Sequence, residues 1–268
     1  MDNKEGIYLI DKPANWTSFD VVAKVRSELR KQSEANGKEP ITKSKLRVGH
    51  AGTLDPFATG LLIILVGTKT KKQNDYMKLD KEYIATLFLG AISTTGDPEG
   101  IITSFYPVIP NPSVCHPRVS GDSIGVNSVK ESRSLHFSRD DTQTKPAITK
   151  KKINEVLSSF IGEIEQIPPQ YSAIKINGQR AYELARKGEK VELKPRKIKL
   201  YDIEILSYKW PMLKILVNCS SGTYIRALAE DIGKSLGCGA YLTALRRTKI
   251  GNYSIDDAKK IESIQIDH

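Results

Sequence analysis

The chain has 268 residues, of which 39% are hydrophobic and 27% charged, so it has the composition of a globular protein of one or two domains. No apolar stretch reaches the roughly 20 residues that span a bilayer, and residues 1–6 contain no apolar signal region, which excludes a membrane helix and predicts a cytoplasmic protein. The formal net charge of +10 favours a polyanionic partner such as nucleic acid.

The cysteine and histidine residues indicate neither a disulfide framework nor a metal centre. Cys115, Cys219 and Cys238 are scattered and odd in number, which is typical of ordinary reduced thiols. His116 and His136 follow no metal-ligand spacing. We therefore expect no bound metal.

A short strand over residues 7–10 and a helix after it open the chain. Thr17 and Asp20 have the spacing of a capping box, and apolar residues follow at helical intervals. Lys12 ends the strand, where a solvated surface lysine is the simpler interpretation and a phosphate contact the alternative. Residues 31–45 are polar and contain glycine and proline, so they are predicted to form a mobile basic loop.

The most distinctive stretch is the loop Gly49–Gly60, with the sequence GHAGTLDPFATG. Its acid, Asp55, stands between leucine and proline and precedes the apolar run 61–66, which is predicted to be a buried element. The loop glycines would let the backbone approach a ligand, and His50 adds a polar side chain nearby. An ordinary Asp-Pro turn is the simpler explanation of Asp55 when this pair is considered alone.

The stretch 81–90 is predicted to be a strand, and alternation places Tyr83 on its apolar face. Tyr83 is then either a half-buried aromatic with its hydroxyl at the surface or a platform on which a base stacks. The loop 94–100 is rich in turn residues, of which Asp97 would be one. Between about residues 105 and 150 the periodicity is lost, which predicts a disordered insertion.

The segments after this insertion combine helices, strands and basic loops. A helix is expected over 153–160, closed by Gly162. The segment 166–188 mixes prolines, tyrosines and cations, which suits a flap over unpaired RNA and equally a proline-stiffened connection with a short helix.

A strand over 213–219, a helix over 225–236 and a basic strand over 242–251 are predicted to complete the fold, with Thr223 able to cap the helix. Arg226 falls in the first turn of that helix, where the positive end of the helix dipole disfavours a cation. Arg226 is therefore either exposed to solvent or paired with a carboxylate or phosphate.

The TruB-type tRNA pseudouridine synthases resemble this chain in four successive motifs, which here are Gly49–Gly60, Lys81–Gly90, Gln166–Gly188 and Ser220–Gly251. The opening residues Gly6–Pro13 and the Trp-Thr-Ser at 16–18 match as well. The similarity covers nearly all of the chain outside the loops at 31–45 and 105–150. Several motifs in the right order make this resemblance highly specific.

The resemblance implies a role for each matching residue. Asp55 corresponds to the catalytic aspartate, Tyr83 to the tyrosine that stacks on the target base, and Arg226 to the arginine that pairs with the aspartate. His50 matches the histidine that helps to hold the T-loop in its flipped-out state, and Lys175 a lysine of the flap that grips the RNA. Further residues expected to line the site are Tyr224, Lys12 and Asp97.

The fold implied by the resemblance is α+β, with a mixed, largely antiparallel sheet flanked by helices and a central catalytic cleft. The catalytic domain would comprise residues 1–254, including the disordered insertion at 107–148 and the RNA-gripping flap at 167–190. Residues 255–268 would form a short tail, because they are too few for the PUA-like RNA-binding domain that ends many bacterial members.

The activity implied by the resemblance is the isomerisation of uridine to pseudouridine at position 55 in the T-loop of tRNA, by base flipping and without a cofactor, in a monomer. Arg226 is expected to keep Asp55 charged by lowering its pKa against desolvation. Two alternatives remain. A non-catalytic RNA-binding protein would not need Asp55, and a carboxylate-based nucleoside or glycoside hydrolase would need a second acid near it.

Overall fold

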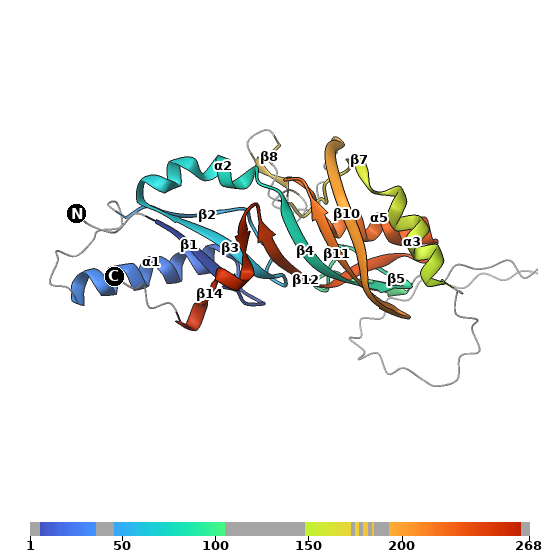
Figure 1. The fold of residues 1–268 in the computed structure, drawn as a ribbon, viewed down its shortest axis with the longest axis horizontal. Helices are drawn as coiled ribbons and strands as arrows, with labels where there is room; N and C mark the ends of the chain where they lie inside the picture. The colour runs from blue at the N-terminus through green and yellow to red at the C-terminus, as the bar shows by residue number, and fades with distance from the viewer. Residues whose placement is uncertain are drawn as a thin grey trace, which may run out of the picture. The chain divides into compact units, whose positions relative to one another are not determined.

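The computed structural model describes residues 6–35, 46–104, 148–172, 175–176, 179–181, 184 and 193–263 (Figure 1). The described helices and strands are β1 (Gly6–Lys12), α1 (Ser18–Ala35), β2 (Val48–Ala51), β3 (Thr59–Val66), the 3-10 turn η1 (Gly67–Lys72), α2 (Gln73–Met77), β4 (Lys81–Leu89), β5 (Ala91–Ser93), β6 (Ile102–Ser104), α3 (Lys150–Ser159), β7 (Gly162–Gln166), β8 (Lys175–Ile176), β9 (Gln179–Arg180), β10 (Arg196–Lys209), β11 (Met212–Cys219), α5 (Ile225–Leu236), β12 (Ala240–Ile250), β13 (Tyr253–Ser254), the turn η2 (Ile255–Asp257), β14 (Lys259–Lys260) and the turn η3 (Ile261–Ser263).

One large sheet organises the described residues. Its strand order is β14-β1-β3-β12-β4-β11-β10-β7, with β2 paired to β3 and β13 to β12. The pairs β1 with β14 and β3 with β12 are parallel, and the other neighbours are antiparallel. Figure 1 shows β4, β11 and β10 side by side in the middle of this sheet. The mixed, largely antiparallel α+β fold is therefore confirmed.

The run 61–66 forms most of β3, which is buried on both faces. Its even-numbered residues Leu62, Ile64 and Val66 pack against α1, while the odd-numbered ones face a separate cluster with Ile250. A strand covered on both sides needs apolar residues at every position, which is why this run does not alternate. The predicted buried element is confirmed, and it fixes the end of the loop that carries Asp55.

Helix α1 starts with the capping box that the sequence predicts. The Asp20 carboxylate accepts from the Thr17 backbone N–H at 2.8 Å, and the Thr17 hydroxyl accepts from the Asp20 N–H at 3.1 Å. The helix continues to Ala35, so residues 31–35 are not part of a loop as predicted. Leu29 and Ser33 are buried near the end of the helix, and this burial stabilises its last turns. The predicted loop at 36–45 lies outside the described residues.

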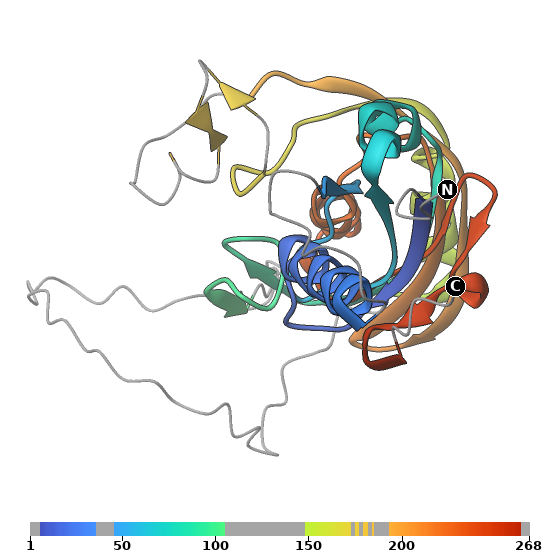
Figure 2. The ribbon, with the colours of Figure 1, turned by 90° about the vertical axis from the view of Figure 1, so that its left-hand side faces the viewer.

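A third core cluster joins β4, β11, β10 and β12 to helices α3 and α5. Alternate residues of β4 and of β11 point into it, as their patterns predict. Helix α5 contributes Ile225, Leu228 and Ile232 and ends at Gly237, whose φ of 73° is a left-handed cap. In Figure 2, α1 and α5 lie on the same side of the sheet. The strand carrying Tyr83 and the helix carrying Arg226 thus share one core.

Helix α3 begins at Lys150, where the Thr149 hydroxyl accepts from the Lys152 backbone N–H at 3.2 Å. It ends at a cap on Phe160, and Gly162 starts β7 with a φ of 112°. Most of the predicted insertion at 107–148 lies outside the described residues, although Ile148 packs against the core. Within the described part of the chain, no helix has the length and apolarity to cross a membrane.

Candidate active site

The Ser18 side chain and two backbone hydrogen bonds hold the loop around Asp55. The Ser18 hydroxyl accepts from the Leu54 N–H at 2.9 Å and donates to the Leu54 carbonyl at 3.2 Å. The Asn15 N–H donates to the Pro56 carbonyl at 2.8 Å. The Asp55 carbonyl also accepts from the Ala58 N–H at 3.1 Å, so the stretch does form a turn. The turn and a functional role for the Asp55 side chain are therefore compatible.

Lys12 is fully buried beneath this loop, so its interpretation as a solvated surface lysine is wrong. Its ammonium group donates to three carbonyl oxygens, those of Pro13 at 2.9 Å, Trp16 at 2.6 Å and Pro56 at 3.1 Å. These oxygens replace the water that the charge would otherwise need. Burial still lowers the pKa of Lys12 to about 8, partly offset by the negative charge of Asp55.

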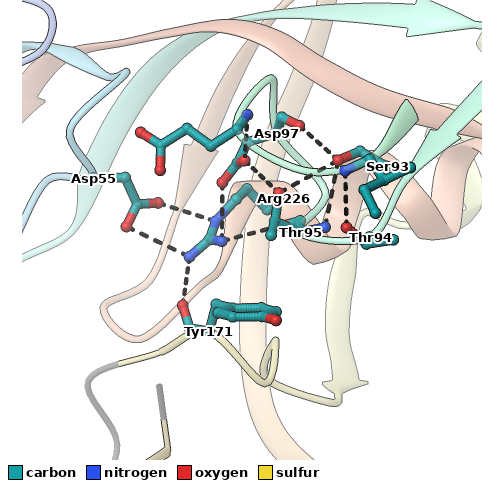
Figure 3. Close-up of polar contacts among 9 residues, drawn as sticks. Asp55, Ser93, Thr94, Thr95, Asp97, Tyr171 and Arg226 are labelled. Atoms are coloured by element: carbon teal, nitrogen blue, oxygen red, sulfur yellow. Dashed lines mark hydrogen bonds and ion pairs between the residues drawn. The ribbon is translucent and has the colours of Figure 1, made fainter. Parts of the chain in front are cut away.

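Arg226 binds the Asp55 carboxylate from the first turn of α5 (Figure 3). Its Nε lies 3.0 Å from one carboxylate oxygen, and Nη2 donates to the other at 3.4 Å. The Arg226 side chain is only 6% exposed, whereas that of Asp55 is 36% exposed. The partner predicted from the dipole argument is thus an aspartate, and the carboxylate remains open to a substrate.

A second aspartate holds the other end of the guanidinium. Arg226 Nη1 contacts an Asp97 oxygen at 3.1 Å and donates to the Thr95 carbonyl at 3.0 Å, while Nη2 donates to the Tyr171 carbonyl at 2.9 Å. Asp97 is 3% exposed and also accepts from the Glu99 N–H at 3.0 Å. Figure 3 shows Arg226 lying between the two carboxylates. Each guanidinium nitrogen therefore faces an acceptor, which fixes its orientation.

The charge balance of this cluster sets the protonation of Asp55. Burial raises the pKa of Asp55, Arg226 lowers it and the negative charge of Asp97 raises it further. Arg226 acts in the predicted direction, but the net shift is upward because desolvation is the larger cause. One guanidinium shared by two carboxylates leaves one negative charge, which Lys12 partly offsets, and a carboxylate in this setting can act as a nucleophile or base.

Tyr83 lies within the core beside the loop, in one cluster with Leu54 and Ala58. It is 8% exposed, so it is more deeply buried than the half-buried aromatic that the sequence suggests. Burial raises the pKa of Tyr83, and the charge of Arg247 lowers it. The phenol is therefore neutral at physiological pH, and its ring packs with the apolar side chains of the loop.

His50 lies on β2 at the start of the loop and is 8% exposed. The Phe19 ring packs edge to face on it, with centroids 5.1 Å apart and planes at 83°. The Gln73 side-chain amide donates to the His50 carbonyl at 2.7 Å. Burial, together with the charge of Arg247, lowers the pKa of His50, so the imidazole is neutral at pH 7.

Tyr224 is the N-cap of α5, where it provides no side-chain cap. The predicted cap, Thr223, instead donates its hydroxyl to the Ser220 carbonyl at 2.9 Å. Gln166 instead holds the backbone of the N-cap residue, since its Oε1 accepts from the Tyr224 N–H at 2.8 Å and its Nε2 donates to the Tyr224 carbonyl at 3.1 Å. The sequence carries no signal for this amide brace, because Gln166 lies 58 residues away.

The predicted flap at 167–190 is described only in part. Lys175 lies on β8, which pairs with β9 in a small separate sheet, with Lys175 opposite Arg180. The role of Lys175 in binding RNA stays a prediction. Tyr171, which precedes this hairpin, reaches the site through its carbonyl and was not among the predicted site residues. Within the described ranges, no group of three or more His, Cys, Asp or Glu residues could hold a metal ion.

Two family models match the chain. The model of the TruB family pseudouridylate synthase (N terminal domain) matches residues 39–113 and 125–225, and that of the tRNA pseudouridylate synthase B C-terminal domain matches residues 226–267. The first match ends one residue before Arg226. Together the two models take in Asp55, Tyr83 and Arg226.

Curated relatives and solved structures agree with the family models. The tRNA pseudouridine synthase B of Phocaeicola vulgatus is 42% identical over 98% of this chain and 93% of its own length. That of Clostridium kluyveri is 40% identical over 96% of this chain and 71% of its own length. A chain from a Cbf5-Nop10-Gar1 complex has a TM-score of 0.62 and 25% identity, over 97% of this chain and 54% of that one. This chain belongs to the TruB family of pseudouridylate synthases.

Proposed function

We propose that this protein isomerises the uridine at position 55 in the T-loop of tRNA to pseudouridine, with Asp55 as the catalytic group and without a cofactor. The observation that carries the proposal is the Asp55 carboxylate, which is ion-paired to the buried Arg226 and yet 36% exposed. The curated relatives at about 40% identity, which are named tRNA pseudouridine synthase B, support tRNA as the substrate.

The reaction is an isomerisation, so it needs no oxidant and no second substrate. The N1–C1′ bond of the uridine breaks, the base turns, C5 bonds to C1′, and the C5 proton is lost while N1 gains one. An ionised Asp55 either attacks C1′ or removes a ribose proton, and both routes require the charged carboxylate. Arg226 holds that carboxylate in one orientation through two contacts.

A uridine within a folded T-loop reaches Asp55 only after it has left its stack. The neighbouring Tyr83 provides an apolar surface that replaces part of the lost stacking. The net charge of +10 would attract the phosphate backbone of the T-arm. We further propose that Lys175 and the segment 167–190 grip this arm, that His50 supports the flipped loop, and that the enzyme acts as a cytoplasmic monomer.

The geometry does not favour the hydrolase alternative. A retaining or inverting hydrolase needs a second carboxyl group that gives or takes a proton at the substrate. The acid nearest to this role is Asp97, but it is 3% exposed and faces the far side of Arg226. Its oxygens are engaged by Arg226 and by the N–H of Glu99.

The test uses an unmodified tRNA transcript that carries tritium at C5 of its uridines. Because C5 loses its hydrogen during the isomerisation, tritium release to water counts product. Wild-type protein should release one equivalent per tRNA, and none from a transcript with cytidine at position 55. Asp55→Asn should bind the same tRNA and release none. Equal RNA binding without release by either protein would support the RNA-binding alternative, and free uracil would support a hydrolase.

A further inference from the structure

The residue Arg247 lies between the two parts of the active site. On β12 it pairs with Tyr83 of β4 on one side and with Gly60 of β3 on the other. Its side chain is 1% exposed. The loop with the catalytic aspartate and the strand with the stacking tyrosine therefore both adjoin this one residue.

The Arg247 guanidinium binds both ends of the catalytic loop. Its Nε donates to the Leu61 carbonyl at 2.8 Å, and its Nη2 donates to the Gly52 carbonyl at 3.0 Å. Between these two carbonyls lie the residues 53–60, with Asp55 near their middle. A planar fork that engages two fixed acceptors defines their separation, whereas a flexible ammonium group does not.

The close approach of Arg247 to this loop requires a glycine at position 60. Gly60 has a φ of 104°, and a Cβ there would collide with the backbone of Arg247. The sequence predicts that Gly60 lets the loop backbone approach a ligand. In the structure, Gly60 lets strand β12 lie against the loop. Gly52 has a φ of 96°, and a Cβ there would lie 3.5 Å from Arg247 Nη1. The loop consequently rests directly on Arg247.

The environment of Arg247 differs from that of a stabilising surface arginine. Among the described residues, no carboxylate forms an ion pair with it, so its hydrogen-bond acceptors are the two loop carbonyls. The preceding residue, Arg246, points to the other face of β12 and binds Asp11 through two hydrogen bonds of 3.0 and 2.8 Å. Two carbonyl oxygens of the loop, rather than a carboxylate, therefore replace the water around the Arg247 charge, which ties this charge to the position of the loop.

We propose that Arg247 is a positioning residue, which fixes the distance between Asp55 and Tyr83 by clamping the Gly52 and Leu61 carbonyls. This inference rests on the proposed tRNA pseudouridine synthase activity. The clamp acts on the catalytic step and leaves RNA binding unchanged, because Arg247 is buried and cannot contact the substrate. Its buried charge acts in the same region, since it lowers the pKa of Tyr83 and of Lys12.

The first experiment compares Arg247→Lys with the matched control Arg246→Lys. Single-turnover tritium release is measured at saturating enzyme, and the Kd for tRNA is measured for each variant in an Asp55→Asn background. A misplaced catalytic group costs on the order of 10- to 100-fold in rate. Arg247→Lys should therefore lose about this much while its Kd stays within about twofold, and Arg246→Lys should keep both.

A rate for Arg247→Lys within twofold of wild type, or a Kd that weakens in parallel with the rate, would overturn the proposal. Wild-type protein in the same assay separates this outcome from failure of the proposed function, because inactive wild type would contradict that function itself. Circular dichroism and thermal unfolding show whether the Arg247→Lys variant is folded.

A second pair of variants decides the question if Arg247→Lys does not fold. Gly52→Ala and Gly162→Ala both place an alanine at a positive φ, of 96° and 112°. Only Gly52 adjoins Arg247, while a Cβ at Gly162 meets nothing within 4 Å. Gly52→Ala should slow the single-turnover rate at least about 10-fold more than Gly162→Ala. Equal rates of the two variants would refute the clamp.

Discussion

Two arginine–aspartate pairs of this protein have similar geometry and different environments. Arg246 and Asp11 make a two-point contact at 3.0 and 2.8 Å, with side chains 40% and 22% exposed. Arg226 and Asp55 make one at 3.0 and 3.4 Å, with Arg226 6% exposed and a second aspartate on the same guanidinium. The pair with the shorter contacts, Arg246 with Asp11, is the one that lies at the surface. Shared charge and burial, rather than contact distance, distinguish the pair that we propose to be catalytic.

The largest expected effect comes from removing the charge of Asp55, with Asp11 as the comparison. Asp55→Asn should lower the single-turnover rate by at least about 10³-fold, because the amide can neither attack nor take a proton. Asp11→Asn should leave the rate within about twofold. Tritium release measures both. Comparable losses in the two variants would mean that the outer pair also serves catalysis.

Exchanging the arginines gives the next largest effect. Arg226→Lys should slow the reaction by about 10²-fold or more, because a lysine cannot contact both Asp55 oxygens and still reach Asp97 and the Tyr171 carbonyl. The Kd for tRNA should not change. Arg246→Lys, in which an exposed pair is merely weakened, serves as the control. A rate of Arg226→Lys near that of wild type would exclude orientation of Asp55 as the role of Arg226.

Asp97, the second aspartate bound to Arg226, leads to a prediction about pH. If Asp55 acts when ionised, as we propose, the rate should fall as pH drops through its raised pKa. The negative charge of Asp97 contributes to that raised pKa. Asp97→Asn should therefore lower the pKa of Asp55 and move the acid limb of the pH–rate profile to lower pH, with a modest loss of rate at pH 7. A limb that stays in place or moves upward would contradict this charge coupling.

The smallest effect concerns stability. Arg246→Met should lower the free energy of unfolding by about 0.2–1 kcal/mol at low salt, since exposed ion pairs contribute little. The difference should shrink in high salt, where such pairs are screened. Urea unfolding at two ionic strengths measures it. A loss well above this range would show that the pair is part of the packed core.

Local patterns predicted the elements that carry the site. The continuous apolar run of β3, the alternation of β4 and the stripe of α5 all follow from residues a few positions apart. The dipole argument left Arg226 either exposed or paired with an anion, and the family resemblance implied a pair with Asp55. The ion pair decides for the second alternative and confirms the pairing.

The supports of the site could not be predicted, because they join distant positions. The Pro56 carbonyl, 44 residues away, helps to solvate the charge of Lys12. Nothing near Lys12 in the sequence distinguishes it from a surface lysine. Gln166 braces the start of α5 across 58 residues. Backbone acceptors such as the Tyr171 carbonyl carry no side-chain identity at all, so the sequence pattern cannot reveal them.

The anchoring of the catalytic loop also bears on how the chain folds. The hydrogen bond from Arg247 to the Gly52 carbonyl joins positions 195 residues apart, and that from Arg226 to Asp55 joins positions 171 apart. Contacts of this separation form late, because the entropy of loop closure opposes them until most of the chain is ordered. During refolding, secondary structure should therefore return before activity, and the isomerase reaction would report only on chains that have completed the sheet.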